Sequence, residues 1–251
     1  MKTKNNTILV TGGATGIGYA MAEALVEAGN TVIICGRRKD RLEEAKSKLP
    51  QIHIHSCDVS RYADRKALYE WVKVNFKNFN VLINNAGIQR TADLKKGVPG
   101  LSDSENEIAT NLAAPIWLSA YFIPLLMKQK EAAIVNVSSG LGFVPIASMP
   151  VYCATKAAVH SFTISMRHQL KDTSVKVFEV VPPMVDTNLG KGSVEETEEE
   201  WNRGIPPSEV AKALLASLEK DRYEVIVGEA GGLVTGSRMN PEETFKNLNS
   251  W

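Results

Sequence analysis

The sequence predicts an α/β fold, a single-domain Rossmann-type doubly wound parallel sheet of about seven strands with helices on both faces. Three observations predict it. Short apolar runs alternate with segments of helical period, a glycine-rich turn follows the first run, and no shift in composition divides the 251 residues. Parallel strands need a crossover element between them, so this alternation implies a parallel sheet covered by helices. The whole chain, 1–251, is expected to form one nucleotide-binding domain.

The first half of the chain sets the pattern. Thr7–Thr11 is a short apolar run, and the helical spacing that begins at Gly16 stops at Gly29. The same alternation then repeats. It predicts strands at 31–35, 52–57 and 81–84, with helices at 38–49 and 63–76 between them.

The second half continues the alternation with longer helices. Strands are expected at 132–137, 175–181 and 224–227, and helices at 104–128, 152–170 and 207–219. The charge-free stretch 108–127 has the length of a membrane span. It contains two prolines and an asparagine, which favour a helix buried in the protein or against a second subunit.

The connection 188–205 differs from the other loops. It joins a strand to a helix through polar residues and a run of five glutamates, and it exceeds the about 2–6 residues of an ordinary αβ loop. Such a connection is either a lid over the substrate or a mobile segment. We expect a substrate lid within the single domain.

Charge and composition limit the partners. The chain has 29 basic and 28 acidic residues, a formal net charge of +1. No global field attracts a polyanion or an acidic membrane, so we expect a small-molecule partner, no nucleic acid and no membrane.

The three cysteines indicate a reducing environment. They are odd in number and form no Cys-x-x-Cys pair, which argues against a disulfide framework and a zinc site. The first residues have no long apolar region typical of a secretory signal, so a cytoplasmic location is expected. His53 and His55 alternate on a predicted strand without a third ligand nearby, and no metal is predicted.

A glycine-rich turn lies between the first predicted strand and helix. Its residues Gly12, Thr15, Gly16, Ile17 and Gly18 stand where a dinucleotide fold places the cofactor's pyrophosphate at a helix N-terminus. Glycine permits the tight turn and the close approach of phosphate to backbone N–H groups. A purely structural turn and a methyltransferase that binds S-adenosylmethionine are the alternatives. No Gly-Lys-Ser/Thr follows, which excludes a P-loop.

The end of the second predicted strand favours NADP over NAD. An NAD-binding fold usually offers a carboxylate to the adenosine ribose at this point. This chain has Gly36 followed by Arg37 and Arg38, and guanidinium groups can bind a ribose 2′-phosphate. The alternative is that both arginines only solvate the start of a helix.

Tyr152 and Lys156 form a candidate acid/base pair. At positions i and i+4 of a predicted helix they share one face. An ammonium about 5 Å from a phenolate, at an effective dielectric near 20, stabilises it by roughly 3 kcal/mol, enough to lower the phenol pKa by about two units. Such a pair also occurs in many ordinary amphipathic helices.

Together these motifs resemble the classical short-chain dehydrogenase/reductase family. The resemblance also includes the Asn84-Asn85-Ala86-Gly87 segment, Ser139 thirteen positions before Tyr152, and the Tyr-Cys-Ala-Thr-Lys sequence that ends at Lys156. It covers nearly the whole chain. Segments 35–38 and 182–187 are similar to those of DltE-type members of the family.

The resemblance implies four catalytic residues. Tyr152 would be the general acid that protonates a carbonyl oxygen, or the base in the reverse direction. Lys156 would lower the pKa of Tyr152 and bind the nicotinamide ribose. Ser139 would hold the substrate oxygen, with Ser138 as the competing serine. Asn111 would position the water through which protons reach solvent, a capped helix kink being the alternative.

The resemblance also implies further cofactor contacts. Asp58 and Val59 would meet the adenine ring, and Asn85, Ala86 and Gly87 would form the floor beneath the adenosine ribose. Val185 and Thr187 would meet the nicotinamide carboxamide and the diphosphate. The chain departs from the family at Pro182-Pro183, where Pro-Gly is usual, so the backbone path toward Val185 and Thr187 is less defined by the resemblance.

These implications define an expected function. The chain would be an NADP-dependent oxidoreductase that transfers a hydride between nicotinamide and a carbonyl or secondary alcohol substrate. The alternative is a non-catalytic NADP-binding sensor or scaffold protein, which has no need for the complete set of four residues. The family and the apolar helices at 108–127 and 152–170 imply a homodimer or homotetramer. The substrate pocket is expected to have an apolar lining from Phe143, Met149, Met184 and Leu189.

Overall fold

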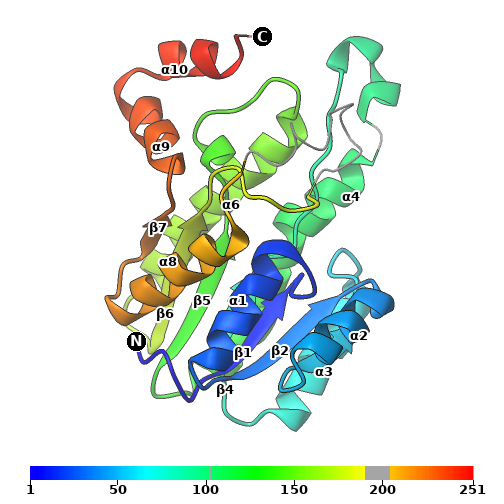
Figure 1. Cartoon of the computed structure of the whole chain (residues 1–251), viewed down its shortest axis with the longest axis vertical. Coiled ribbons are helices and arrows are strands. Elements are labelled where there is room, and N and C mark those ends of the chain that lie inside the picture. Colours follow the sequence, from blue (N-terminus) through cyan, green and yellow to red (C-terminus); the bar gives the residue numbers. More distant parts are fainter. Residues whose placement is uncertain (102, 190–203, 251) are drawn as a thin grey trace.

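Seven parallel strands form one sheet in the computed structural model, which describes residues 1–101, 103–189 and 204–250. The strand order is β3-β2-β1-β4-β5-β6-β7, so the predicted doubly wound sheet is confirmed (Figure 1). The strands are β1 Thr7–Thr11, β2 Thr31–Gly36, β3 His53–Ser56, β4 Phe79–Asn84, β5 Ala132–Val137, β6 Val175–Val181 and β7 Glu224–Ile226.

Helices cover both faces of this sheet. Helices α1 (Gly16–Glu27), α2 (Lys39–Lys48) and α8 (Pro207–Glu219) pack on one face. Helices α3 (Tyr62–Asn75), α5 (Ala114–Leu126) and α6 (Pro150–Gln169) pack on the other. The remaining elements are η1 Leu94–Lys96, η2 Val98–Leu101, α4 Ser104–Ile108, η3 Ala109–Ala113, η4 Gly140–Gly142, α9 Ala230–Met239 and α10 Pro241–Leu248.

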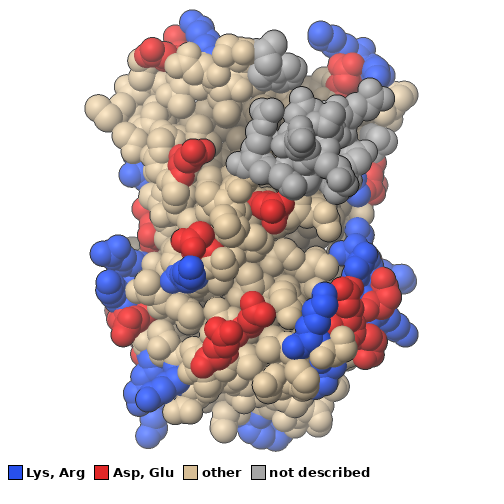
Figure 2. All heavy atoms as spheres, viewed as in Figure 1, with Lys and Arg blue, Asp and Glu red and all other residues tan. Residues whose placement is uncertain are grey.

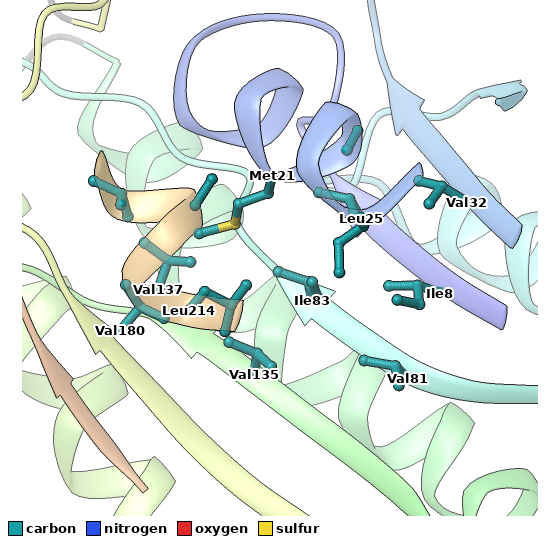
Figure 3. Close-up of a cluster of buried hydrophobic side chains, with 14 of the residues drawn as sticks. Ile8, Met21, Leu25, Val32, Val81, Ile83, Val135, Val137, Val180 and Leu214 are labelled. Carbon is teal, nitrogen blue, oxygen red and sulfur yellow. The ribbon is translucent and has the colours of Figure 1, made fainter. Parts of the chain in front are cut away.

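The central strands are apolar on both sides because both sides are buried. Successive side chains of a strand point to opposite faces, and Ile8 and Leu9 of β1 accordingly join different core clusters. Figure 3 shows the first cluster, in which Met21 of α1 and Leu214 of α8 meet over Ile83 and Val135 of the sheet. This packing fixes the start of α1 relative to the strand ends.

Charged side chains of both signs are mixed on the face shown in Figure 2. With a net charge of +1, this face presents no region of a single sign. Recognition of a charged ligand there must come from individual groups close to the ligand.

The predicted helix at 104–128 is interrupted. A π-helical turn, η3, separates α4 from α5 and contains Asn111. Pro115 supplies one reason, because its nitrogen cannot donate the helical hydrogen bond to the Asn111 carbonyl. The Asn111 side chain supplies another by bonding the backbone of Ile88. Single π-helical turns of this kind frequently stand at functional sites.

The charge-free stretch packs partly into the core. Among the described residues one helical run, Val98–Leu126, is long and apolar enough to cross a membrane by length and composition alone. The same test is passed by core helices. Here Leu118 and Phe122 of α5 are buried against the sheet, whereas Ile108 and Trp117 are exposed. The expected core contact is present, and an uncovered apolar face remains.

Two C-terminal helices follow β7, although the sequence predicts none there. Gly231 and Gly232 in the first turn of α9 have poor helix propensity, which hides the helix from pattern analysis. Helix α9 packs against η4, because a Cβ built on Gly140 would lie 2.9 Å from Leu233 Cδ1. After α10, Asn249 accepts a hydrogen bond from the backbone N–H of Ala147 at 2.6 Å. The C-terminal region therefore supports the loop that precedes α6.

Candidate active site

The site lies where the strand order changes direction. From β1 the sheet extends through β2 to β3, and from the adjacent β4 it extends through β5 to β7. Loops on either side of such a switch point turn away from each other, leaving a crevice at the carboxyl ends of the strands. The glycine-rich turn, the segment after β4 and the segment after β5 all leave the sheet at this edge.

The glycine-rich turn has a backbone that other residues cannot adopt without strain. Gly12 and Gly16 have φ angles of +63° and +56°. A Cβ built on Gly18 would lie 2.3 Å from the Gly12 carbonyl oxygen. The first turn of α1 therefore sits directly against the strand end, with its N-terminal N–H groups at the crevice. This arrangement fits the pyrophosphate of a dinucleotide.

Thr11 and Asn85 hold this turn against β4. The Thr11 hydroxyl accepts hydrogen bonds from the backbone N–H groups of Asn85 and Ala86, both at 3.0 Å. The Asn85 side-chain amide donates to the Thr11 carbonyl at 2.9 Å. The Asn85 side chain thus supports the glycine-rich turn, and the backbone N–H groups of Asn85 and Ala86 are bonded to Thr11.

The segment after β6 returns to the glycine-rich turn despite its two prolines. The Pro182 carbonyl accepts a hydrogen bond from Gly140 N at 3.1 Å. A Cβ built on Gly16 would lie 3.0 Å from Thr187 Cγ2. The structure therefore brings Thr187 to the position where the diphosphate contact is expected.

Val185 lies at the base of the expected lid. It forms an isolated parallel bridge with Ile205, and Asp186 N donates to the Ile205 carbonyl at 2.9 Å. The two ends of the 188–205 connection are thereby joined. Residues 190–203 of the expected lid lie outside the described residues.

The end of β2 presents two guanidinium groups to solvent. Arg37 and Arg38 are exposed, and within the described ranges neither side chain has a hydrogen bond or an ion pair. Gly36 before them leaves no side chain between the strand end and these cations. Both arginines are free to bind an anion.

Asp58 and Val59 follow β3 on the same side of the sheet. One carboxylate oxygen of Asp58 accepts hydrogen bonds from the backbone N–H and the hydroxyl of Ser60, at 3.0 and 2.7 Å. The Val59 carbonyl accepts from the Arg65 guanidinium at 2.7 Å. These contacts fix the loop that follows β3.

Tyr152 and Ser139 meet at the carboxyl end of β5. Both are buried, Tyr152 with 5% of its surface exposed, and the Ser139 hydroxyl makes a polar contact that lowers the pKa of the Tyr152 phenol. Ser139 also accepts a hydrogen bond from Leu141 N at 3.1 Å, which orients its side chain. The competing Ser138 instead donates to buried Glu179 at 2.5 Å.

Lys156 lies one helical turn beyond Tyr152. Its ammonium donates to the Val137 carbonyl at 2.9 Å and lies 5.6 Å from the centroid of the Tyr152 ring. Burial lowers the pKa of Lys156 to about 8. The site therefore holds a cation that loses its proton more readily than an exposed lysine.

The expectation that Lys156 lowers the pKa of Tyr152 is wrong for this structure. The pKa of Tyr152 is raised well above its usual value, because burial disfavours the phenolate more than Ser139 stabilises it. Lys156 is directed at the Val137 carbonyl, and burial lowers its own pKa. The i, i+4 spacing brings the two groups near each other but does not determine their orientation.

Asn111 is held between the segment after β4 and α6. Its side-chain oxygen accepts from Ile88 N at 2.9 Å, while its amide donates to the Ile88 carbonyl at 2.8 Å and to Thr155 Oγ1 at 3.2 Å. A Cβ built on Gly87 would lie 3.5 Å from Asn111 Oδ1 and 3.7 Å from Lys156 Nζ. The structure thus brings Asn111 and Lys156 together around Gly87.

Glu107 is a site residue that the sequence analysis missed. It is fully buried, and one of its oxygens accepts a hydrogen bond from Arg90 N at 3.1 Å. The other oxygen has no hydrogen-bond partner among residues 1–101, 103–189 and 204–250. Burial raises the pKa of Glu107, and its negative charge raises the pKa of both Tyr152 and Lys156. The only signal in the sequence is a carboxylate four positions before Asn111.

The two strand histidines make aromatic contacts. His55 stacks on Trp71 with ring centroids 4.5 Å apart, and His53 meets the edge of Phe76 at 5.0 Å. Desolvation lowers the pKa of both imidazoles. The part of the chain that the structure describes contains no group of three His, Cys, Asp or Glu residues able to hold a metal ion.

The residues expected to line the substrate pocket have different surroundings. Phe143 packs against His160, and Met149 Sδ accepts a hydrogen bond from Gln89 Nε2 at 2.7 Å. Met184 and Leu189 are exposed at the start of the 188–205 connection. The structure does not bring these four side chains into one described cavity.

Comparisons with known proteins agree with this geometry. Residues 6–198 match the family model for short chain dehydrogenases. The chain is 50% identical over 250 residues to the oxidoreductase DltE of Bacillus subtilis (strain 168), covering all of this chain and 99% of that protein. The expected likeness to DltE-type members is therefore confirmed.

Solved structures show the same fold. A short chain dehydrogenase from Burkholderia cenocepacia in complex with NADP is 26% identical, with a TM-score of 0.84 over 99% of both chains. A member from Burkholderia phymatum in complex with NAD has a TM-score of 0.86 over 99% of this chain and 97% of that one. At 20% identity the second likeness concerns the fold alone. With its glycine-rich turn, its parallel sheet and these matches, the chain belongs to the short-chain dehydrogenase family and is an oxidoreductase with an NAD(P)-binding Rossmann fold.

Proposed function

We propose that this oxidoreductase uses NADP to interconvert a carbonyl compound and a secondary alcohol, with Tyr152 as general acid and base. One observation carries the proposal. The Tyr152 phenol contacts the Ser139 hydroxyl, and buried Lys156 lies one turn away, at the same edge of the sheet as the glycine-rich turn. A hydroxyl pair beside a cofactor crevice can hold a carbonyl oxygen and protonate it.

The cofactor would be held by residues from every loop at this edge. Bound NADPH would supply the hydride. The residues proposed to hold it are Gly12, Thr15, Gly16, Ile17, Gly18, Arg37, Arg38, Asp58, Val59, Asn85, Ala86, Gly87, Tyr152, Lys156, Val185 and Thr187.

During reduction, the chain's own residues handle the proton. Ser139 donates a hydrogen bond to the substrate oxygen, where negative charge develops, and Tyr152 transfers its phenol proton to that oxygen. Lys156, with a pKa of about 8, can return a proton to the phenolate. Asn111, which bonds Ile88 and lies with Lys156 around Gly87, would position the water through which protons reach Lys156. In oxidation the same steps run in reverse.

The proposal is tested by cofactor binding followed by a substrate screen. We expect NADPH to bind, and its oxidation to be accelerated by at least one member of a panel of ketones, aldehydes, quinones and sugars. NADPH binding without turnover across the panel would favour the sensor or scaffold alternative. S-Adenosylmethionine binding in place of a nicotinamide cofactor would overturn the proposal.

NADP preference is proposed from the two free arginines after β2. The relative from Burkholderia cenocepacia, which is in complex with NADP, supports it. Arg37→Ala and Arg38→Ala should each weaken NADPH binding by about tenfold and leave NADH binding unchanged, because a charge-assisted hydrogen bond to the 2′-phosphate is lost. Arg41→Ala is the control, since Arg41 is paired with Glu44. The affinities are measured by fluorescence titration, and equal or tighter binding of NADH by the unmodified protein would contradict the preference.

Glu107→Gln should shift the pH profile of alcohol oxidation to lower pH. The Glu107 charge raises the pKa of Tyr152, so removing the charge lets the phenolate form at lower pH. Gln retains an acceptor for Arg90 N, which limits structural change. The measurement is kcat/KM against pH. The control is Glu105→Gln on the exposed side of the same helix, and an unchanged or alkaline-shifted Glu107→Gln profile would contradict the assigned electrostatic effect.

We propose that copies of the chain associate through the uncovered faces of α4, α5 and α6. Ile108 is 45% exposed and Trp117 is 52% exposed, and an apolar hollow of about 350 Å³ lies between Ile108, Leu112 and Val151. Light scattering at micromolar concentration should show a dimer or tetramer that Trp117→Glu weakens. The control is Val74→Glu, which changes an apolar residue on α3 that is 62% exposed. A monomeric unmodified protein would contradict the proposal.

A further inference from the structure

A buried polar chain links three elements behind the candidate active site. Ser138, directly after β5, donates a hydrogen bond from its hydroxyl to Glu179 Oε1 at 2.5 Å. Glu179 lies on β6 and has no exposed surface. Its other oxygen lies 2.8 Å from His160 Nδ1 on α6. None of these three residues belongs to the four proposed catalytic residues.

The order of the three groups excludes a serine nucleophile. In a hydrolase triad the histidine stands between the serine and the carboxylate and takes the serine proton. Here the carboxylate stands in the middle, and the Ser138 hydroxyl donates to Glu179 rather than to His160. Glu179 accepts the hydrogen bond from the Ser138 hydroxyl with one oxygen and faces the imidazole with the other, so it joins the two side chains.

The Ser138–Glu179–His160 network connects the segment that carries Ser139 with the helix that carries Tyr152. Ser138 directly precedes Ser139, and the Ser138 N–H donates to the Val180 carbonyl at 2.9 Å. His160 is on the helix that carries Tyr152, eight residues later and therefore on roughly the same face. The His160 ring also packs against Phe143, just after the η4 turn, at 4.4 Å between centroids. Glu179 is thus tied to both elements that determine where the serine and the phenol meet.

We propose that Glu179 and His160 are positioning residues for the reaction. They keep the Ser139 hydroxyl in contact with the Tyr152 phenol by fixing β5 and β6 against α6. Glu179 is fully buried, so the loss of one partner would leave a polar atom without a hydrogen bond, and this cost keeps the connection rigid. The inference rests on the proposed function, because its kinetic consequence requires Tyr152 and Ser139 to act on a substrate.

The test compares three substitutions on α6. His160→Leu removes the donor to Glu179, whereas His160→Asn places an amide N–H near the position of Nδ1. His168→Leu makes the same change at an exposed position of the helix and is the matched control. We expect His160→Leu to lower kcat by at least about tenfold, since small displacements of reacting groups are costly. The KM of the substrate and the affinity for NADPH should stay unchanged, and His160→Asn should restore most of kcat.

A second readout needs no substrate. In the complex with NADP, the ¹³Cζ resonance of Tyr152, assigned from the Tyr152→Phe spectrum, reports on its contact with Ser139. We expect this resonance to move in His160→Leu and to return in His160→Asn. If His160→Leu does not fold, Ser138→Ala takes its place, because it removes only the serine hydroxyl from the Ser138–Glu179–His160 network. We expect it to move the Tyr152 resonance and to lower kcat, as for His160→Leu.

The outcomes separate this inference from the proposed function. If no substrate is turned over by the unmodified protein, the proposed function fails. The Tyr152 resonance still decides whether the Ser138–Glu179–His160 network positions the phenol. An unchanged resonance in the variants would overturn the inference. The inference would also be overturned if His160→Leu changed kcat, KM and NADPH affinity to the same extent and His160→Asn did not restore them. That result would indicate general destabilisation. A shifted resonance with unchanged kcat would also overturn the kinetic role.

Discussion

Tyr152→Phe is expected to lower kcat by about 10²–10⁴-fold, the usual contribution of a positioned general acid. The substitution removes only the phenol oxygen, which makes a polar contact with Ser139. Burial raises the pKa of Tyr152, so the group is protonated at neutral pH and is available as a proton donor for reduction. The measurement is steady-state NADPH oxidation with a substrate identified by the screen.

The same variant should retain most of the cofactor affinity, because Tyr152 is one of many proposed contacts, and the glycine-rich turn and the arginines after β2 lie on other elements. Tyr223→Phe is the matched control. Tyr223 is half-exposed, its ring packs against Phe178 and the Arg167 guanidinium, and no described residue forms a hydrogen bond with its hydroxyl. Unchanged turnover in Tyr152→Phe would refute the assigned acid. A parallel loss of NADPH binding would indicate a structural effect in its place.

Gly18→Ala is expected to lower the unfolding free energy by about 1–3 kcal/mol, the usual cost of overpacking. The added Cβ would lie 2.3 Å from the Gly12 carbonyl oxygen and 2.5 Å from Asn85 Nδ2. The first of these is a backbone atom of the glycine-rich turn, so relief of the contact must move that turn. We therefore also expect NADPH binding to weaken by more than tenfold.

Chemical denaturation and cofactor titration check this prediction. Gly232→Ala is the control, because a Cβ built on Gly232 meets no atom within 4 Å and the residue lies in α9. There the alanine should stabilise the helix by roughly 0.5–1 kcal/mol. Equal stabilities of Gly18→Ala and the unmodified protein would show that the turn can move away from α1 without cost.

The fold could be predicted from the sequence because its signals are local. Each central strand is buried on both faces, so it appears as a continuous apolar run, and the glycine-rich turn marks the first passage from strand to helix. The helix at 104–128 was predicted as continuous because the π-helical turn depends on tertiary contacts. The Asn111 side chain bonds Ile88, a residue 23 positions away. No local pattern contains that contact.

The candidate site was predictable in its residue types but not in its electrostatics. The i, i+4 spacing pairs Tyr152 with Lys156, and the resemblance to the family adds Ser139, whereas the pKa of the phenol depends on how deeply the site is buried. Glu107 and Glu105 are equivalent in the sequence, and only packing shows that the first is buried and the second is exposed. The Glu179 to His160 contact likewise joins a strand and a helix whose pairing the sequence does not specify.

The bridge between Val185 and Ile205 has a consequence for how such enzymes diversify. It joins the residues before and after the 190–203 segment. That segment can therefore be lengthened, shortened or exchanged while β6 and α8 keep their positions. Once the ends are held together, doubling the length of a loop costs only about 0.6 kcal/mol of closure entropy. Selection for a new substrate can therefore change the sequence of this segment while the fold that holds the reactive groups stays the same.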